Sequence, residues 1–159
     1  MKYVLCVGVI AGFSYIGICI RNHLSKRELF YTSLISFIEQ FVINVNFIQL
    51  NFIECLDREC EKNNELSKVF SYFKDVYING NKRQVLKHQY LSEKELLDVF
   101  DCLNSIGATD CENQVVILQG FKIRFEQKRE ECKVLNTKYS GLAVKMSILT
   151  GCLVVLLLL

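Results

Sequence analysis

The chain has 159 residues and a formal net charge of only +2, with basic and acidic residues mixed along it, which disfavours a nucleic-acid-binding protein. Hydrophobic residues make up 51% of the sequence, a high share for a soluble protein of this size. Because they concentrate at the two ends of the chain, we expect one domain between two membrane segments.

Residues 1–20 are predicted to form an N-terminal transmembrane helix. The stretch from Tyr3 to Ile20 carries no charge and would span about 27 Å as a helix, against a hydrocarbon core of roughly 30 Å. The alternative is a cleavable signal peptide, but no small-x-small cleavage site follows the apolar run, which favours a retained anchor. Gly8 and Gly12 form a small-x-x-x-small pattern that lets another helix approach closely, either the C-terminal helix or a second subunit in a homo-oligomer.

Residues 21–141 are predicted to form a helical domain. Periodic apolar residues indicate helices over 25–44, 65–78 and 93–105, a short helix over 83–90, and a second helix after the alternating stretch 45–52, which could be a strand by its period alone. Ser92 and Glu95 have the spacing of a capping box at the start of the 93–105 helix. The residues expected to face the core are Leu29, Phe30, Leu34, Phe37, Ile38 and Phe41, then Leu66, Val69, Phe70, Phe73 and Tyr77, then Leu96, Leu97, Phe100 and Leu103.

In the last third of the chain, one helix is predicted to end and one long helix is predicted to begin directly after it. Gly107 is a typical helix end, while Thr109 and Glu112 have capping-box spacing and Asp110 adds negative charge at the new helix start. An apolar stripe then follows through Ile117, Phe121, Phe125, Cys132, Leu135 and Tyr139. Residues 142–159 are predicted to form a C-terminal transmembrane helix in which Lys145 extends its amine to the interface. The predicted fold is all-α, a small antiparallel bundle of five or six helices flanked by two transmembrane helices.

Basic residues follow the first span and precede the second, which predicts a domain that faces the cytoplasm and termini that face out. Cysteine usage agrees with this orientation. Three of the eight cysteines fall in the predicted spans, so the domain keeps an odd number, which is unsuited to a disulfide framework.

Residues 93–112 are rich in acids and residues 122–138 in bases. This distribution suits docking of a charged partner and contact with anionic lipid, or alternatively a solvated helix face.

Catalytic and metal-binding residues are hard to find in the sequence. Neither His23 nor His88 has a sequence neighbour that suggests a ligand pair or a nucleophile–base pair. Cys55 and Cys60 lack the second close pair of a structural zinc site. We therefore predict a non-enzyme without metal or cofactor; a lipid-bound or cysteine-reactive enzyme would need an exposed thiol of low pKa.

The order of these features resembles the stage III sporulation protein AB family of endospore-forming bacteria over nearly the whole chain. The most specific part is a run of apolar, glycine and polar residues at the predicted helix corner, carried by Leu103, Ile106, Gly107, Thr109, Asp110, Glu112 and Gln114.

The resemblance implies a component of the mother-cell membrane around the forespore, in a channel complex linking the two cells. It also implies a cytoplasmic domain similar to the helical domains of the inner-membrane platform protein of type II secretion and type IV pilus machines, which sit against a cytoplasmic ATPase. On this reading Gly107 and Asp110 build the corner, and Glu112 and Gln114 are candidates for contact with the ATPase. The alternative from another class is a membrane sensor or adaptor with an extracytoplasmic helical domain.

Overall fold

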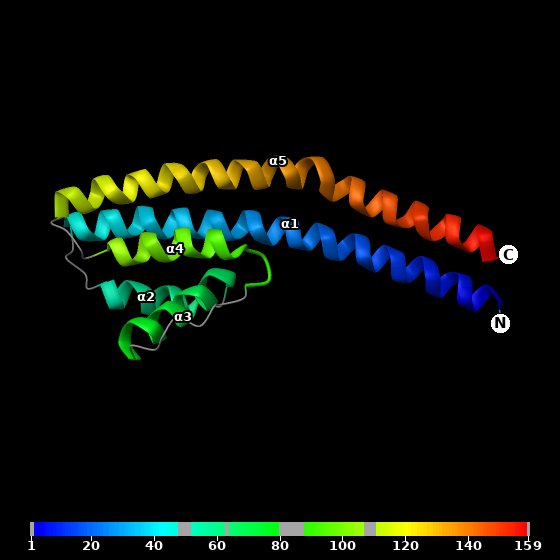
Figure 1. Ribbon diagram of the computed structural model, residues 1–159, viewed down its shortest axis with the longest axis horizontal. Helices are drawn as coiled ribbons and strands as arrows, with labels where there is room; N and C mark the ends of the chain where they lie inside the picture. The colour runs from blue at the N-terminus through cyan, green and yellow to red at the C-terminus, as the bar shows by residue number, and fades with distance from the viewer. Residues whose placement is uncertain (1, 48–51, 63, 80–87, 107–110, 159) are drawn as a thin grey trace. The chain divides into compact units, whose positions relative to one another are not determined.

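The computed structural model describes residues 2–47, 52–62, 64–79, 88–106 and 111–158 (Figure 1). Its regular elements are the helices α1 (Lys2–Phe47), α2 (Phe52–Glu61), α3 (Glu65–Asn79), α4 (Glu93–Ser105) and α5 (Cys111–Leu158). The all-α prediction is therefore confirmed for the described residues. The chain divides into two compact units, one made of 1–28 with 130–159 and the other of 29–129.

The two long helices run without interruption from the predicted membrane segments into the predicted domain. The sequence holds no proline, and no glycine lies between Ile20 and Ser25, so nothing forces a break there. Of the short helix predicted over 83–90, residues 80–87 lie outside the described part and the described residues 88–90 are not helical. The described helices thus number five in all, where five or six were expected in the domain in addition to the two spans.

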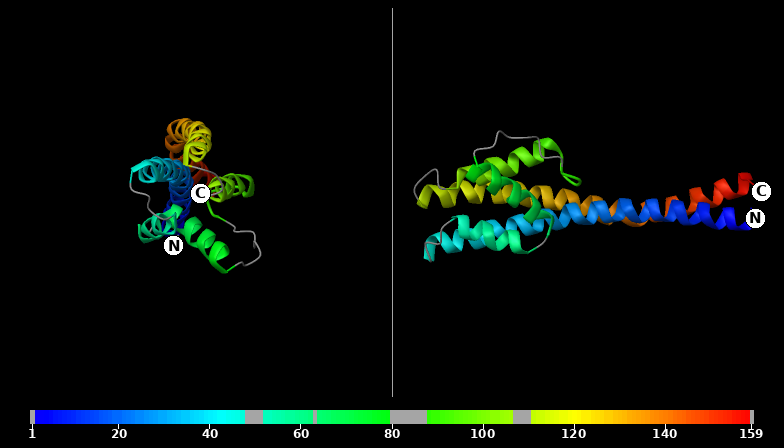
Figure 2. Two further views of the ribbon diagram at one scale, coloured as in Figure 1. Left: turned by 90° about the vertical axis from the view of Figure 1, so that its left-hand side faces the viewer. Right: turned by 90° about the horizontal axis from the view of Figure 1, so that it is seen from below.

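In the unit formed by 1–28 and 130–159, α1 and α5 pair antiparallel, with the start of α1 beside the end of α5 (Figures 1 and 2). Gly17 makes the closest approach, since a Cβ there would lie 3.0 Å from both the Cβ of Ser147 and the Cα of Val144. Apart from the neighbouring backbone of their own helix, no atom of the described residues lies within 4 Å of a Cβ built at Gly8 or Gly12. In this structure the intramolecular contact therefore uses a different glycine from the predicted pair.

Two described helices are long and apolar enough to cross a membrane, one within Cys6–Asn44 and one within Glu112–Leu157. Only 6% of the best window of each is buried. Large apolar side chains on both helices are instead exposed, among them Val7, Tyr15, Ile16, Leu149, Leu153 and Leu156. This exposure on two paired helices is compatible with a membrane protein, because lipid can cover apolar surface that the fold leaves open.

The core of the 29–129 unit is built on the second half of α1. The predicted inward residues of that segment are buried except Leu29, whose side chain is 60% exposed. In α3 the buried residues include Leu66, Val69 and Phe70, as predicted. In α4 the prediction for Leu97 is wrong: Leu96, Val99 and Leu103 share the buried face, and Leu97 lies about 100° further round the helix.

On α5 the predicted stripe is displaced by one position in its first part. Leu118 is 1% exposed where Ile117 was predicted to be buried, and Phe125 continues the stripe seven residues later. Cys132 is buried as expected, whereas Leu135 and Tyr139 are exposed. A helix so rich in apolar residues carries more than one plausible stripe, and tertiary contact selects among them.

The capping box at the start of α4 is confirmed. The backbone N–H of Glu95 donates to Ser92 Oγ, and the backbone N–H of Ser92 donates to Glu95 Oε2 at 2.9 Å. The other carboxylate oxygen of Glu95 accepts a hydrogen bond from the hydroxyl of Tyr31 on α1, at 3.0 Å. One buried carboxylate therefore both starts α4 and ties it to α1.

The glycine contacts give a direct test of the helix pairing. Gly17→Leu should destabilise the protein by about 1–3 kcal/mol, because the new side chain must displace the backbone of Val144. Thermal unfolding of the full chain in detergent, followed by circular dichroism, measures this. Gly12→Leu is the matched control in the same helix and should leave the melting temperature unchanged. A lower melting temperature for Gly12→Leu than for Gly17→Leu would contradict the pairing.

Candidate functional site

Of the predicted corner between α4 and α5, the α4 side lies within the described residues. Leu103 and Ile106 are both buried, and the backbone N–H of Ile106 donates to the carbonyl of Leu103 at 3.2 Å, which closes the helix. Gly107, Thr109 and Asp110 lie outside the described residues, so their roles at the corner stay predictions.

The two residues predicted to contact a partner differ in exposure. Glu112 is exposed in the first turn of α5, as a docking contact requires. Gln114 is only 6% exposed, so it packs in the core and its side chain is not presented for docking. The surface beside Glu112 is instead apolar: Val116 is 67% and Ile123 57% exposed, and both lie close to the Glu112 face of α5 at helical spacing. An exposed apolar stripe with a carboxylate at its head is a candidate interaction surface.

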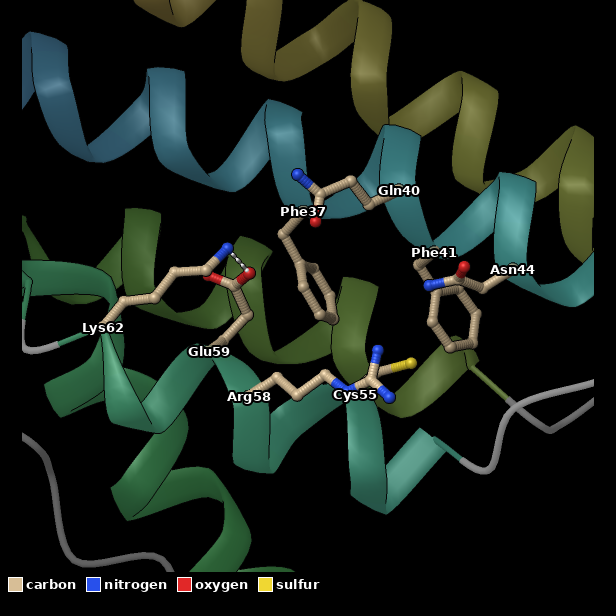
Figure 3. A pocket seen from close by; sticks show the side chains of 8 residues that line it. All are labelled: Phe37, Gln40, Phe41, Asn44, Cys55, Arg58, Glu59 and Lys62. Carbon is tan, nitrogen blue, oxygen red and sulfur yellow. Dashed lines mark hydrogen bonds and ion pairs between the residues drawn. The ribbon is translucent and has the colours of Figure 1, made fainter. Parts of the chain in front are cut away.

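A pocket of about 140 Å³ lies between α1 and α2 (Figure 3). Phe37 and Phe41 line it on the α1 side, and the remaining lining residues are Gln40, Asn44, Cys55, Arg58, Glu59 and Lys62. Glu59 is 5% exposed and forms an ion pair with Lys62. This pairing satisfies the carboxylate as it is removed from water. The pocket is thus apolar at its base and mostly basic or amide at its rim.

His88 is held in a cage of rings and backbone. Its ring lies 5.8 Å from that of Phe30 and 5.8 Å from that of Tyr90, and its Nδ1 accepts the backbone N–H of Tyr90. Nε2 lies 4.0 Å from a carboxylate oxygen of Glu65 on α3. Burial lowers the pKa of His88, and the nearby Glu65 opposes that shift. The Glu65 contact joins residues far apart in the sequence, so no local pattern could have indicated it.

Metal ligands and reactive thiols were considered in the sequence, and the described residues can be compared with both expectations. Among them, no group of three or more His, Cys, Asp and Glu side chains is placed to hold a metal ion. Burial raises the pKa of the Cys55 thiol and raises that of Cys102 to about 12. These two thiols therefore have the opposite of the low pKa that a reactive cysteine needs.

The fold defines an all-helical protein with two candidate membrane-spanning helices that bracket, in sequence, a compact helical unit. The chain belongs to the stage III sporulation protein AB family, whose family model matches residues 2–159. A comparison with curated proteins and one with solved structures each give no match. Membership of this family implies a role at stage III of sporulation.

The environment of His88 predicts how stability depends on pH. Because its folded-state pKa lies below the ordinary value of about 6.5, the unfolded chain takes up the proton first as pH falls. The free energy of unfolding should therefore decrease between pH 7.5 and 5.5, by at most about 1.4 kcal/mol per pH unit. Denaturant unfolding of the full chain in detergent at the two pH values measures this.

His88→Gln should reduce that pH dependence, because the amide takes up no proton. His23→Gln, which removes the other, exposed histidine of the chain, is the matched control. Equal pH dependence in the unsubstituted chain and in His88→Gln would contradict the assignment to His88.

Proposed function

We propose that this protein is a non-enzymatic membrane component of a sporulation-specific, secretion-like channel complex between mother cell and forespore. It acts there as a platform that docks a cytoplasmic ATPase. The observation that carries the proposal is a compact helical unit placed in sequence between two candidate spans, in a chain of the stage III sporulation protein AB family.

The antiparallel pairing of α1 and α5 supports the membrane part of the proposal. Two spans that run in opposite directions return the chain to the side from which it came, so residues between them lie on one side of the bilayer. Basic residues such as Arg21 and Lys138 flank the spans on the side of the central unit, which favours the cytoplasm for that unit. The membrane concerned is the mother-cell membrane around the forespore.

The docking part of the proposal uses the exposed stripe of α5. Glu112 offers a charge that fixes orientation, and Val116 and Ile123 offer apolar area whose removal from water would stabilise a complex. The core of the unit does not use these side chains, which leaves them free to serve a partner. The partners on this proposal are the ATPase and the other membrane subunits of the complex.

Topology is tested first, with a membrane-impermeant maleimide on intact and permeabilised cells. Cys60 is the reporter, because its side chain is half-buried whereas Cys55, Cys102 and Cys132 are buried. In a chain that keeps Cys60 and has its other cysteines replaced by serine, labelling that appears only after permeabilisation is the expected result. Lys2→Cys should be labelled in intact cells, since the termini face out on this proposal. Labelling of Cys60 in intact cells would place the domain outside and favour the sensor.

Docking is tested by charge reversal at the head of the stripe. Glu112→Lys combined with Val116→Asp should lower co-purification of the ATPase of the same complex at least tenfold, because it reverses the charge and adds a charge to the apolar area. Asp75→Lys, an exposed acid on α3, is the matched control and should leave co-purification unchanged. Undiminished co-purification with the doubly substituted protein, at unchanged helix content, would contradict the docking surface.

A further inference from the structure

The outer face of α4 presents an apolar side chain among acids. Leu97 is 49% exposed, and the exposed Glu93 and Asp101 lie one turn before and one turn after it on the same face. Lys94 is the only basic residue of this helix, so the face is net acidic. No buried contact of the unit requires Leu97, because Leu96, Val99 and Leu103 already supply the core face.

The pocket between α1 and α2 has the complementary chemistry. A cavity of roughly 150 Å³ lined by apolar groups accepts a benzene ring, so about 140 Å³ over Phe37 and Phe41 accommodates a leucine side chain. Arg58 stands at the rim and is exposed. No hydrogen bond or ion pair joins its guanidinium to another residue that the structure describes. A cation beside an apolar pocket selects an apolar anchor that has an acid next to it.

We propose that the α4 face of one copy of this chain docks on the α1/α2 pocket of a second copy. Leu97 enters the pocket over Phe37 and Phe41, and a carboxylate of Glu93 or Asp101 pairs with Arg58. The second copy is the occupant because the same chain carries both halves of the contact, an acidic face with one leucine anchor and a basic-rimmed pocket of that anchor's size. The contact does not depend on ATPase docking, which uses α5.

The two halves lie on opposite sides of the 29–129 unit. Both panels of Figure 2 separate α4 from the α1/α2 pair across the bundle. A contact between different surfaces of identical chains is heterologous, so a bound pair leaves one α4 face and one pocket free, on different copies. The interaction therefore builds a row of copies that runs across the helix axes of this unit, and it closes into a ring where the rotation per copy permits.

Disulfide trapping tests the contact in the full chain, in membranes, with the natural cysteines replaced by serine. Gln40→Cys at the pocket rim and Leu97→Cys on α4, placed in one chain, should give a ladder of covalent multimers on a non-reducing gel. A mixture of the two single variants should give dimers and nothing larger. If the chain that carries both cysteines gives no ladder, or if Leu97→Cys alone gives dimers, the heterologous contact is overturned.

Charge exchange gives an independent test that leaves both apolar parts in place. Arg58→Glu should lower the oligomeric mass of the detergent-solubilised full chain, measured by light scattering. Glu93→Lys with Asp101→Lys should lower it as well, and all three together should restore it. Asp75→Lys is the control and should change nothing. An unsubstituted chain that is monomeric in detergent would overturn the proposal. So would variants of unchanged helix content whose oligomeric mass equals that of the unsubstituted chain.

Discussion

The 29–129 unit depends on one face of α1, between Phe30 and Phe41. Every other described helix of this unit contacts that face. The ring of Phe70 on α3 lies 4.7 Å from that of Phe37, and Phe52 on α2 lies 5.8 Å from Phe41. Tyr31 reaches α4 through its hydroxyl and lies 6.2 Å from the ring of Phe125 on α5. Because these contacts share one continuous helix, a change in the rotation of α1 would disturb all of them at once.

The buried carboxylate of Glu95 fixes which face of α4 points toward α1. A carboxylate removed from water is costly unless it is hydrogen-bonded, and here Tyr31 and Ser92 supply the donors. Once Glu95 is turned inward, Leu96, Val99 and Leu103 follow by helical spacing. The same rotation leaves Leu97 and Asp101 outside. The chemistry of the outer surface is therefore a consequence of an interaction in the core.

The sequence predicted what depends on local spacing. The aromatic residues of α1 recur at helical intervals, and the Ser92 capping box is a four-residue pattern, so both were found without knowledge of neighbours. The assignment of Leu97 to the core failed because Leu96 and Leu97 are adjacent and equally apolar. What separates them is the hydrogen bond from Tyr31, a residue 64 positions from Glu95. Long-range pairing of this kind leaves no periodic signal.

The same limit applies to the glycines and to His88. A small-x-x-x-small pattern identifies a helix that can be approached closely but does not say on which face, and the contact formed at Gly17 in place of Gly8 and Gly12. For His88 the decisive neighbours are Phe30 and Glu65, which belong to α1 and α3. The pocket between α1 and α2 arises only when the two helices pack, so its lining could not be assembled from the sequence.

A protein that works by assembly needs surface side chains that are not engaged in contacts within its own fold. Glu95 and Glu59 are engaged in this way, because each is buried and each carboxylate is bonded within the 29–129 unit, Glu95 to Tyr31 and Glu59 to Lys62. Glu112, Leu97 and Arg58 are exposed and contribute no contact on which the described core depends. Stability and partner recognition therefore rest on different side chains, so that substitutions at the exposed set can alter assembly while the helical unit stays folded.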